Sequence, residues 1–205
     1  GYLTSVGQDW MGDAFLDLWR NEGVDASKVT RHPTAPTGVS FVTHSAAGHK
    51  FDYLRKNSAA SLMTPDALAG DYIAGTRILH LSAIGQAISD SARATCDVAI
   101  DIARKAGVKV SYDTNLRLRL WDLDVARTVI DATIARCDIA LPSLDDSRQL
   151  TGLEEPEAIA EPPSPPLQTA PTTRLPMSID EEAPHDVSAP ASGRLTIYRS
   201  RPAAA

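Results

Sequence analysis

The middle of the chain alternates short apolar runs with amphipathic helical segments, and this rhythm limits the possible folds more than any other feature. Residues 77–81, 108–112 and 138–141 have the length and apolar character of strands. The segments between them, residues 89–105 and 124–136, carry apolar residues at helical spacing. Strands and helices that alternate at this spacing form parallel βαβ units with right-handed crossovers. We therefore expect an α/β fold built on a parallel sheet.

Further elements flank this core. A helical period over residues 12–21 stops at Gly23, a residue typical of helix C-caps. Two β-like runs surround Gly48 and predict a hairpin over about residues 38–55, which lies outside the strand–helix rhythm and is expected to be a small appended sheet. The remaining predictions are a helix start at Thr64-Pro65-Asp66, a helix over residues 143–151 ended by Gly152, and a further helix from about Glu154.

The composition changes near residue 161. Nine of the 14 prolines lie in the last 45 residues, which show no sustained apolar period. Such a segment cannot bury enough apolar surface to fold, so we expect residues 161–205 to be a disordered tail whose only strand-like piece is residues 195–199. The folded domain is expected to span residues 1–160.

Bulk composition excludes several classes of protein. The net charge of −6 gives no basic surface for nucleic acid or for an anionic membrane. No apolar stretch approaches the roughly 18 residues of a membrane span. Cys96 and Cys137 lie far apart in the sequence, and without a signal peptide we expect two free thiols in a cytoplasmic protein.

Polar side chains gather where the predicted strands end. Ligands of open α/β sheets bind beyond the carboxyl ends of the strands, and parallel neighbours bring these ends to one edge. We therefore predict a small-molecule site there. An alternative stays open, in which the acid and amide only stabilise a turn and the arginines are solvated. The three clusters are His80, Ser82 and Gly85; Asp113, Asn115, Arg117 and Arg119; and Pro142, Ser143, Asp145 and Asp146.

Other motifs of the sequence give less evidence about function. The chain contains no G-x-x-x-x-G-K-[ST] phosphate loop and no G-x-G-x-x-G fingerprint. The glycines of "VGQDWMGDAF" (residues 6–15) could bring the backbone close to a ligand or simply make a turn before a helix. The histidines show no metal-ligand spacing, so no metal site is predicted. Trp10, Trp19 and Trp121 are expected to be packing residues.

Several segments together resemble the ribokinase-like (PfkB) carbohydrate kinases. "VGQDWMGDAFLDLWRNEGVDASKV" is similar to their first signature, and "PTGVSFV" to the lid strand that follows. "FDYLRKNSAASLMTP", "YDTNLRLRLW" and "LPSLDDSRQLTG" resemble, more narrowly, the 2-keto-3-deoxygluconate kinases. The resemblance covers about residues 1–160 in the family's order. It implies a three-layer α/β/α fold with a small β lid, here incomplete.

The resemblance also implies site residues. Tyr53 and Arg55 match positions that bind the acid sugar, and Arg117 matches the arginine that holds its carboxylate end. Ile84 stands where a backbone contact to the sugar is made. Ser40 departs from the family, which often has Tyr at that position.

Three further residues are expected to support this site. Asp113 and Asn115 come shortly before Arg117 in the sequence. Asp146 stands near a position that helps to organise Mg²⁺ in the wider family. The family uses ATP and Mg²⁺, but its G-A-G-D motif, which supplies the catalytic base and the anion hole, does not match any segment of this chain. Asp13, in "GDAF", belongs to the first signature and is not expected to be catalytic.

The resemblance therefore implies an ATP-dependent kinase of 2-keto-3-deoxygluconate that is incomplete at both ends, through a frameshift or a truncated gene, and inactive by itself. Two alternatives remain. The chain could be a non-catalytic module that binds a sugar acid or dimerises through its lid hairpin, or it could belong to another PfkB sugar kinase.

Overall fold

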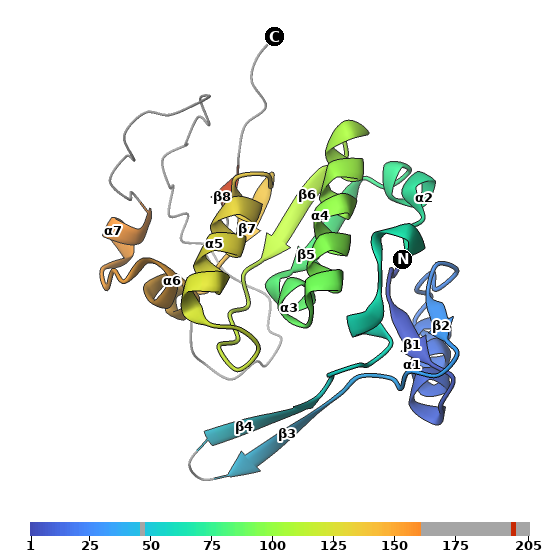
Figure 1. Cartoon of the computed structure of the whole chain (residues 1–205). Helices are drawn as coiled ribbons and strands as arrows, with labels where there is room; N and C mark the ends of the chain where they lie inside the picture. Colours follow the sequence, from blue (N-terminus) through green and yellow to red (C-terminus); the bar gives the residue numbers. More distant parts are fainter. Residues whose placement is uncertain (46–47, 161–197, 200–205) are drawn as a thin grey trace. The chain divides into compact units, whose positions relative to one another are not determined.

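The computed structural model describes residues 1–45, 48–160 and 198–199 (Figure 1). The chain folds into short strands, α-helices and two turns of 3₁₀-helix, η1 (Ala60–Leu62) and η2 (Pro65–Ala67). The strands are β1 (Ser5–Gly7), β2 (Thr30–His32), β3 (Val39–Ser45), β4 (Gly48–Leu54), β5 (Ile78–Ser82), β6 (Lys109–Asp113), β7 (Ile139–Leu141) and β8 (Tyr198–Arg199). The α-helices are α1 (Trp10–Asn21), α2 (Gly70–Ala74), α3 (Ala83–Ala87), α4 (Asp90–Lys105), α5 (Leu123–Ile134), α6 (Leu144–Thr151) and α7 (Pro156–Ala160).

The chain divides into two compact units. The first contains Gly1–Thr76 and Gly85–Ala106, and the second contains Arg77–Ile84 together with the described residues of Gly107–Ala205.

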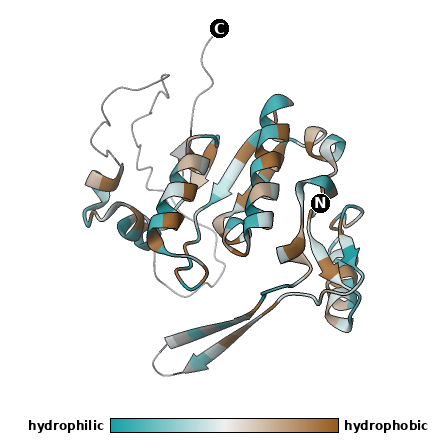
Figure 2. Ribbon diagram, viewed as in Figure 1, coloured by the Kyte–Doolittle hydropathy of each residue, from teal (hydrophilic) through white to brown (hydrophobic). Residues whose placement is uncertain are grey.

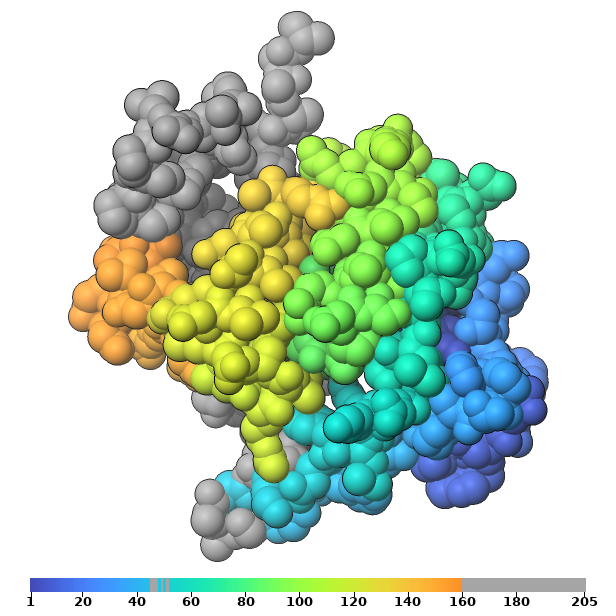
Figure 3. Space-filling view, viewed as in Figure 1, coloured from blue at the N-terminus to red at the C-terminus, as the bar shows by residue number. Residues whose placement is uncertain are grey.

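The first unit contains two small sheets and a group of helices. β1 and β2 pair in parallel, and β3 and β4 form the predicted antiparallel hairpin, in which Ser40 lies opposite Tyr53. In Figure 1 the hairpin extends as a two-stranded arm from the part of this unit that contains β1, β2 and α1. The segment that contains η1, η2 and α2 packs against α4, as the space-filling view also shows (Figure 3).

Helix α4 has clear sequence signals at its start, along its length and at its end. Ser89 accepts a hydrogen bond from the Ala92 amide and so caps the helix. The buried residues recur at three- to four-residue spacing, which gives the helix one apolar face and one polar face (Figure 2). Gly107 follows the helix with a φ of +72°. The prediction of a helix over residues 89–105 is therefore confirmed.

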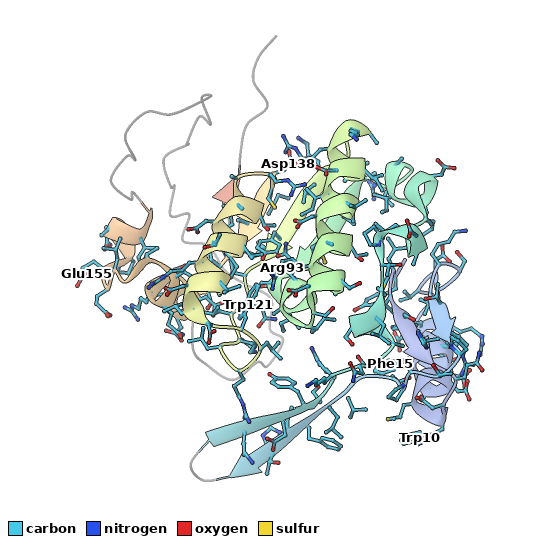
Figure 4. The ribbon with its side chains drawn as sticks, viewed as in Figure 1. Trp10, Phe15, Arg93, Trp121, Asp138 and Glu155 are labelled. Atoms are coloured by element: carbon cyan, nitrogen blue, oxygen red, sulfur yellow. The ribbon has the colours of Figure 1, made fainter. Side chains whose placement is uncertain are left out.

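The second unit is built on a four-stranded sheet with the order β5-β6-β7-β8. The pairs β5–β6 and β6–β7 are parallel, which confirms the predicted parallel α/β arrangement. Both Val110 and Tyr112 of β6 are fully buried, as expected for a central strand. Asp138, labelled in Figure 4, links β7 to β6, because its carboxylate accepts the Val110 amide at 2.9 Å and contacts Lys109 Nζ at 2.7 Å.

The C-terminal region is described only in part. Tyr198 and Arg199 pair antiparallel with Ala140 and Ile139 of β7, within the strand-like piece that the sequence predicts. The prediction of disorder for the rest of residues 161–205 lies outside the described residues. Strand β2 and helices α2 and α3 were not predicted, since each is short and lacks a sequence period of its own.

The three tryptophans behave differently. Trp121 is buried, and Trp19 stacks on Tyr2 and Phe15 with ring centroids 5.0 and 5.5 Å apart, so both are packing residues. The prediction is wrong for Trp10, which is 76% exposed (Figure 4). The reason is its place as the first residue of α1, directly after the N-cap Asp9.

Both cysteines are free thiols, as predicted. Among residues 1–45, 48–160 and 198–199, no helix is long and apolar enough to cross a membrane.

Candidate functional site

The carboxyl ends of β5, β6 and β7 meet at one edge of the second unit's sheet. Ser82, the last residue of β5, pairs with Asp113, and Asp113 pairs with Leu141 at the end of β7. The structure therefore brings Ser82, Asp113 and the segment that follows Leu141 to one edge, as the order of the strands predicts.

The loop after β6 begins with a local turn. Asp113 Oδ1 accepts the backbone amide of Asn115 at 3.2 Å, and Asn115 adopts a φ of +27°, in the region that Asn tolerates better than most residues. Asp113 therefore does stabilise a turn, and one of its carboxylate oxygens makes this bond. Burial raises the pKa of the Asp113 carboxyl, although the Asn115 amide that it accepts works in the opposite direction.

Asp146 supports the same loop from the N-terminus of α6. The residue is only 8% exposed, and its Oδ2 accepts both the Thr114 hydroxyl and the Leu116 amide at 3.1 Å. Ser143 caps α6 by accepting the Asp146 amide at 3.0 Å. Asp146 was predicted only as a support residue near a magnesium position. The geometry gives it a specific task, which is to hold the Thr114 side chain and the Leu116 backbone on either side of Asn115.

Arg117 comes directly after this supported segment. Its side chain is half-buried, and Nη1 donates to the carbonyl of Leu116 at 2.8 Å. The neighbouring Arg119 is exposed. The loop thus begins in a fixed turn, and the guanidinium of Arg117 is close enough to Asp113 to act on its carboxyl electrostatically.

Ile84 lies two residues beyond β5, at the start of α3, and is the last residue of the segment Arg77–Ile84 of the second unit. Its backbone amide is 3.4 Å from the hydroxyl of Ser82. The residue therefore lies near the sheet edge that contains Asp113, and its contact with a sugar stays a prediction.

Tyr53 and Arg55 belong to the hairpin of the first unit. Tyr53 lies in β4, and the guanidinium carbon of Arg55 lies 5.1 Å from the centre of its ring, within the range of a cation–π contact. Ser40 stands opposite Tyr53 in the register, so the two side chains share one face of the hairpin. The structure thus pairs Tyr53 with Arg55 in one unit and groups Arg117 with Asp113, Asn115 and Asp146 in the other.

Two Gly-Asp pairs of the chain do not form a catalytic base. Asp13 is exposed on α1, and its Oδ1 lies 2.6 Å from Arg31 Nη1. Asp71 is exposed in the first turn of the five-residue helix α2. An exposed carboxylate in a surface ion pair or a short helix lacks the environment that tunes a general base.

The match to protein families decides the identity of this fold. Residues 1–162 match the pfkB family carbohydrate kinases. The chain belongs to this family. The match runs from the first β-strand to just beyond α7 and includes all the predicted site residues.

Three curated relatives illustrate the range of names. A 2-dehydro-3-deoxygluconokinase of Thermoproteus tenax is 33% identical over 160 residues, and one of Bacillus subtilis is 33% identical over 165 residues. These matches cover 76% and 78% of this chain. A fructokinase of Solanum tuberosum is 32% identical over 151 residues, or 73% of this chain. The matches cover 48%, 51% and 46% of the three relatives, so the chain spans about half their length.

Solved structures show the same fold. A PfkB protein from Polaromonas sp. JS666 matches 78% of this chain and 55% of its own, with a TM-score of 0.74 and 33% identity. The 2-dehydro-3-deoxygluconokinase of Thermotoga maritima matches 78% of this chain and 51% of its own, with a TM-score of 0.70 and 25% identity. An E. coli structure in complex with ATP and Mg²⁺ has a TM-score of 0.70 at 23% identity. The match covers 78% of this chain and 51% of the E. coli chain, and at this identity it supports the fold alone.

Proposed function

We propose that this chain forms the sugar-acid-binding part of an ATP-dependent kinase that phosphorylates 2-keto-3-deoxygluconate at its terminal hydroxyl. The loop of Arg117, held by Asp146 at the carboxyl edge of the sheet, is the observation that carries the proposal. Two relatives named 2-dehydro-3-deoxygluconokinase, each 33% identical, support the choice of substrate.

The proposed contacts follow from the chemistry of the side chains. A guanidinium offers a planar fork of donors that matches a carboxylate in a bidentate pair, so Arg117 would hold the acid end of the sugar. Tyr53 and Arg55 would contact the sugar from the hairpin, where the cation–π contact orients the guanidinium. Asp113 and Asn115 would bind sugar hydroxyls with the atoms that the turn leaves available.

The described residues offer no side-chain cluster that would hold a metal ion by itself. Over residues 1–45, 48–160 and 198–199, no group of three or more His, Cys, Asp or Glu side chains converges. Asp146, the residue expected near the metal position, directs Oδ2 at Thr114 and Leu116. The proposal therefore gives this chain the task of binding and orienting the sugar, and it assigns no ligand of the metal–nucleotide complex.

Phosphoryl transfer depends on alignment and on stabilisation of developing charge. An arginine clamp at the carboxylate would point the far hydroxyl of the sugar away from the sheet edge, toward the nucleotide. The G-A-G-D motif expected to supply the base and the anion hole does not occur in these 205 residues. We expect this polypeptide alone to bind the sugar acid and not to turn over ATP. A coupled ADP-release assay with turnover like that of an intact kinase would contradict this expectation.

A fructokinase is the second candidate, because fructokinases match at 32–34% identity. Calorimetric titration with 2-keto-3-deoxygluconate, fructose and ATP separates the candidates. Binding of the sugar acid alone supports the proposal, and preferential binding of fructose supports the second candidate. Binding of neither sugar would overturn both.

We also propose that the hairpin mediates a homodimer. The register places Val39, Phe41 and Leu54 on the hairpin face opposite Tyr53, and Phe41 and Leu54 are 53% and 66% exposed. A two-stranded sheet with exposed apolar side chains is marginal in water by itself, so a second copy is the expected cover of Phe41 and Leu54. Light scattering that shows a dimer which Phe41→Ser converts to a monomer would support this; a wild-type monomer would exclude it.

A further inference from the structure

Asp9 and Thr37 form a dense set of hydrogen bonds at the base of the hairpin. Asp9 Oδ2 accepts the Thr37 amide at 2.8 Å, and Oδ1 accepts the Thr37 hydroxyl at 2.7 Å and the Gly12 amide at 2.8 Å. Thr37 Oγ1 also accepts the Gly7 amide at 2.8 Å. Only the bond from Gly12 is an ordinary helix cap. The bonds that involve Thr37 connect segments that lie 28 and 30 residues apart in the sequence.

The glycines around Asp9 are required by this arrangement. A Cβ atom on Gly7 would lie 2.4 Å from Asp9 Oδ2 and 2.7 Å from the Thr37 amide nitrogen. A Cβ atom on Gly12 would lie 2.4 Å from the Gly7 carbonyl oxygen and 3.1 Å from Thr37 Oγ1. Both distances of 2.4 Å are shorter than real contacts. The glycines of residues 6–15 therefore let the backbone approach Thr37. This explanation adds to the two that the sequence left open, a close approach to a ligand and a turn before a helix.

Thr37 leads directly into the hairpin, since β3 begins two residues later. The returning strand is fixed to the same place, because the Ala59 amide donates to the Pro36 carbonyl at 2.8 Å. A Cβ atom on Gly38 would lie 3.1 Å from the hydroxyl of Ser58, which is 1% exposed. Both ends of the hairpin thus meet at one buried base, and Asp9 joins this base to β1 and α1.

The hydrogen bonds that Asp9 accepts favour the charged form of its carboxyl group. The Thr37 amide, followed by the Gly12 amide, holds the pKa of the Asp9 carboxyl below its usual value. Both oxygens therefore act as acceptors at neutral pH, and the three donors from Thr37 and Gly12 are all satisfied.

We propose that Asp9 and Thr37 are positioning residues that fix the direction of the β3–β4 hairpin and thereby the placement of Tyr53 and Arg55. Neither residue touches the sugar; each acts through the base of the hairpin. The part of this inference that concerns the sugar rests on the proposed function, whereas the part that concerns the hairpin does not.

Three variants separate this role from general stability. Thr37→Val keeps the shape of the side chain and removes the hydroxyl that joins Asp9 to Gly7. Thr37→Ser keeps the hydroxyl that Thr37→Val removes, and it serves as the matched control. Asp9→Ser keeps a good helix cap, since Ser and Asp are about equal there, but its single oxygen cannot hold both the amide and the hydroxyl of Thr37.

The direct measurement is the distance between spin labels at Thr43 on the hairpin and Asp17 on α1, with Cys137 replaced by Ser. We expect one narrow distribution for the wild type and Thr37→Ser and a broader one for Thr37→Val and Asp9→Ser. Sugar-acid affinity should fall roughly five- to thirtyfold in the two broadened variants, the loss expected for one or two buried hydrogen bonds.

Each outcome is decisive. Distributions that are equally narrow in all folded variants would overturn the proposal. If the wild type binds no sugar acid, the proposed function fails, and the distances still decide whether the pair fixes the hairpin. If Thr37→Val does not fold, Asp9→Ser carries the same test, because its helix cap remains.

Discussion

Replacing Asp146 by Ala tests whether this carboxylate holds the Arg117 loop. The change removes the acceptor of the Thr114 hydroxyl and of the Leu116 amide, both at 3.1 Å and both buried. A hydrogen bond to a charged group contributes about 1.5–3 kcal/mol, and a buried donor left without an acceptor costs about 1–3 kcal/mol. Allowing for overlap between these terms, we expect the free energy of unfolding to fall by about 2–4 kcal/mol.

The neighbouring Asp145 provides the control for this change. Both carboxylates lie in the first turn of α6, so each replacement removes the same favourable interaction with the helix dipole. Asp145 is exposed, and Arg148 Nη1 lies 3.8 Å from its Oδ1, so Asp145→Ala should cost less than about 1 kcal/mol.

Urea unfolding measures the difference between the two variants, and trypsin gives a second readout because Arg117 and Arg119 are cleavage sites within the loop. We expect faster cleavage there in Asp146→Ala than in Asp145→Ala. Equal stability and equal cleavage in the two variants would refute the role given to Asp146.

Two further predictions concern ionisable groups. Burial raises the pKa of the Cys96 thiol to about 12, so we expect native Cys96 to resist iodoacetamide at pH 8 and to react once urea unfolds the chain; rapid native labelling, read by mass spectrometry, would contradict this. Bonds from Ser27, then from the Tyr72 hydroxyl, lower the pKa of Asp25 to about 2, which is below its unfolded value of 3.8. Their contribution to stability is therefore present above pH about 4 and is lost as the pH falls toward 2. Tyr72→Phe should raise the pKa of Asp25 in an NMR titration, and an unchanged value would count against the bond.

The sequence predicts best those elements whose signals are local. Ser89 and Ser143 cap α4 and α6, the buried residues of α4 recur at helical spacing, and Gly152 ends α6, so the predicted bounds agree with the structure to within about a residue. Strand β2 shows the limit, because Thr-Arg-His has no strand pattern and becomes a strand only by pairing with β1.

The candidate site also combines residues that local sequence signals predict with contacts that they do not. Asp113, Asn115 and Arg117 could be predicted because they follow an apolar strand directly. The contacts that support the site could not, since Asp146 reaches Leu116 across 30 residues and Asp9 reaches Thr37 across 28. Sequence spacing contains no signal for such pairs until the fold brings them together.

The central claim is that Arg117 holds the carboxylate of a sugar acid, and titration calorimetry with 2-keto-3-deoxygluconate tests it most directly. We predict that the wild type binds and that Arg117→Ala weakens binding by roughly ten- to a hundredfold, as expected for loss of a charged hydrogen-bonded pair. Arg119→Ala, a change of the same size at the exposed neighbour, should bind within about threefold of the wild type, since an exposed charge contributes little. Equal affinities for the wild type and Arg117→Ala would contradict the account.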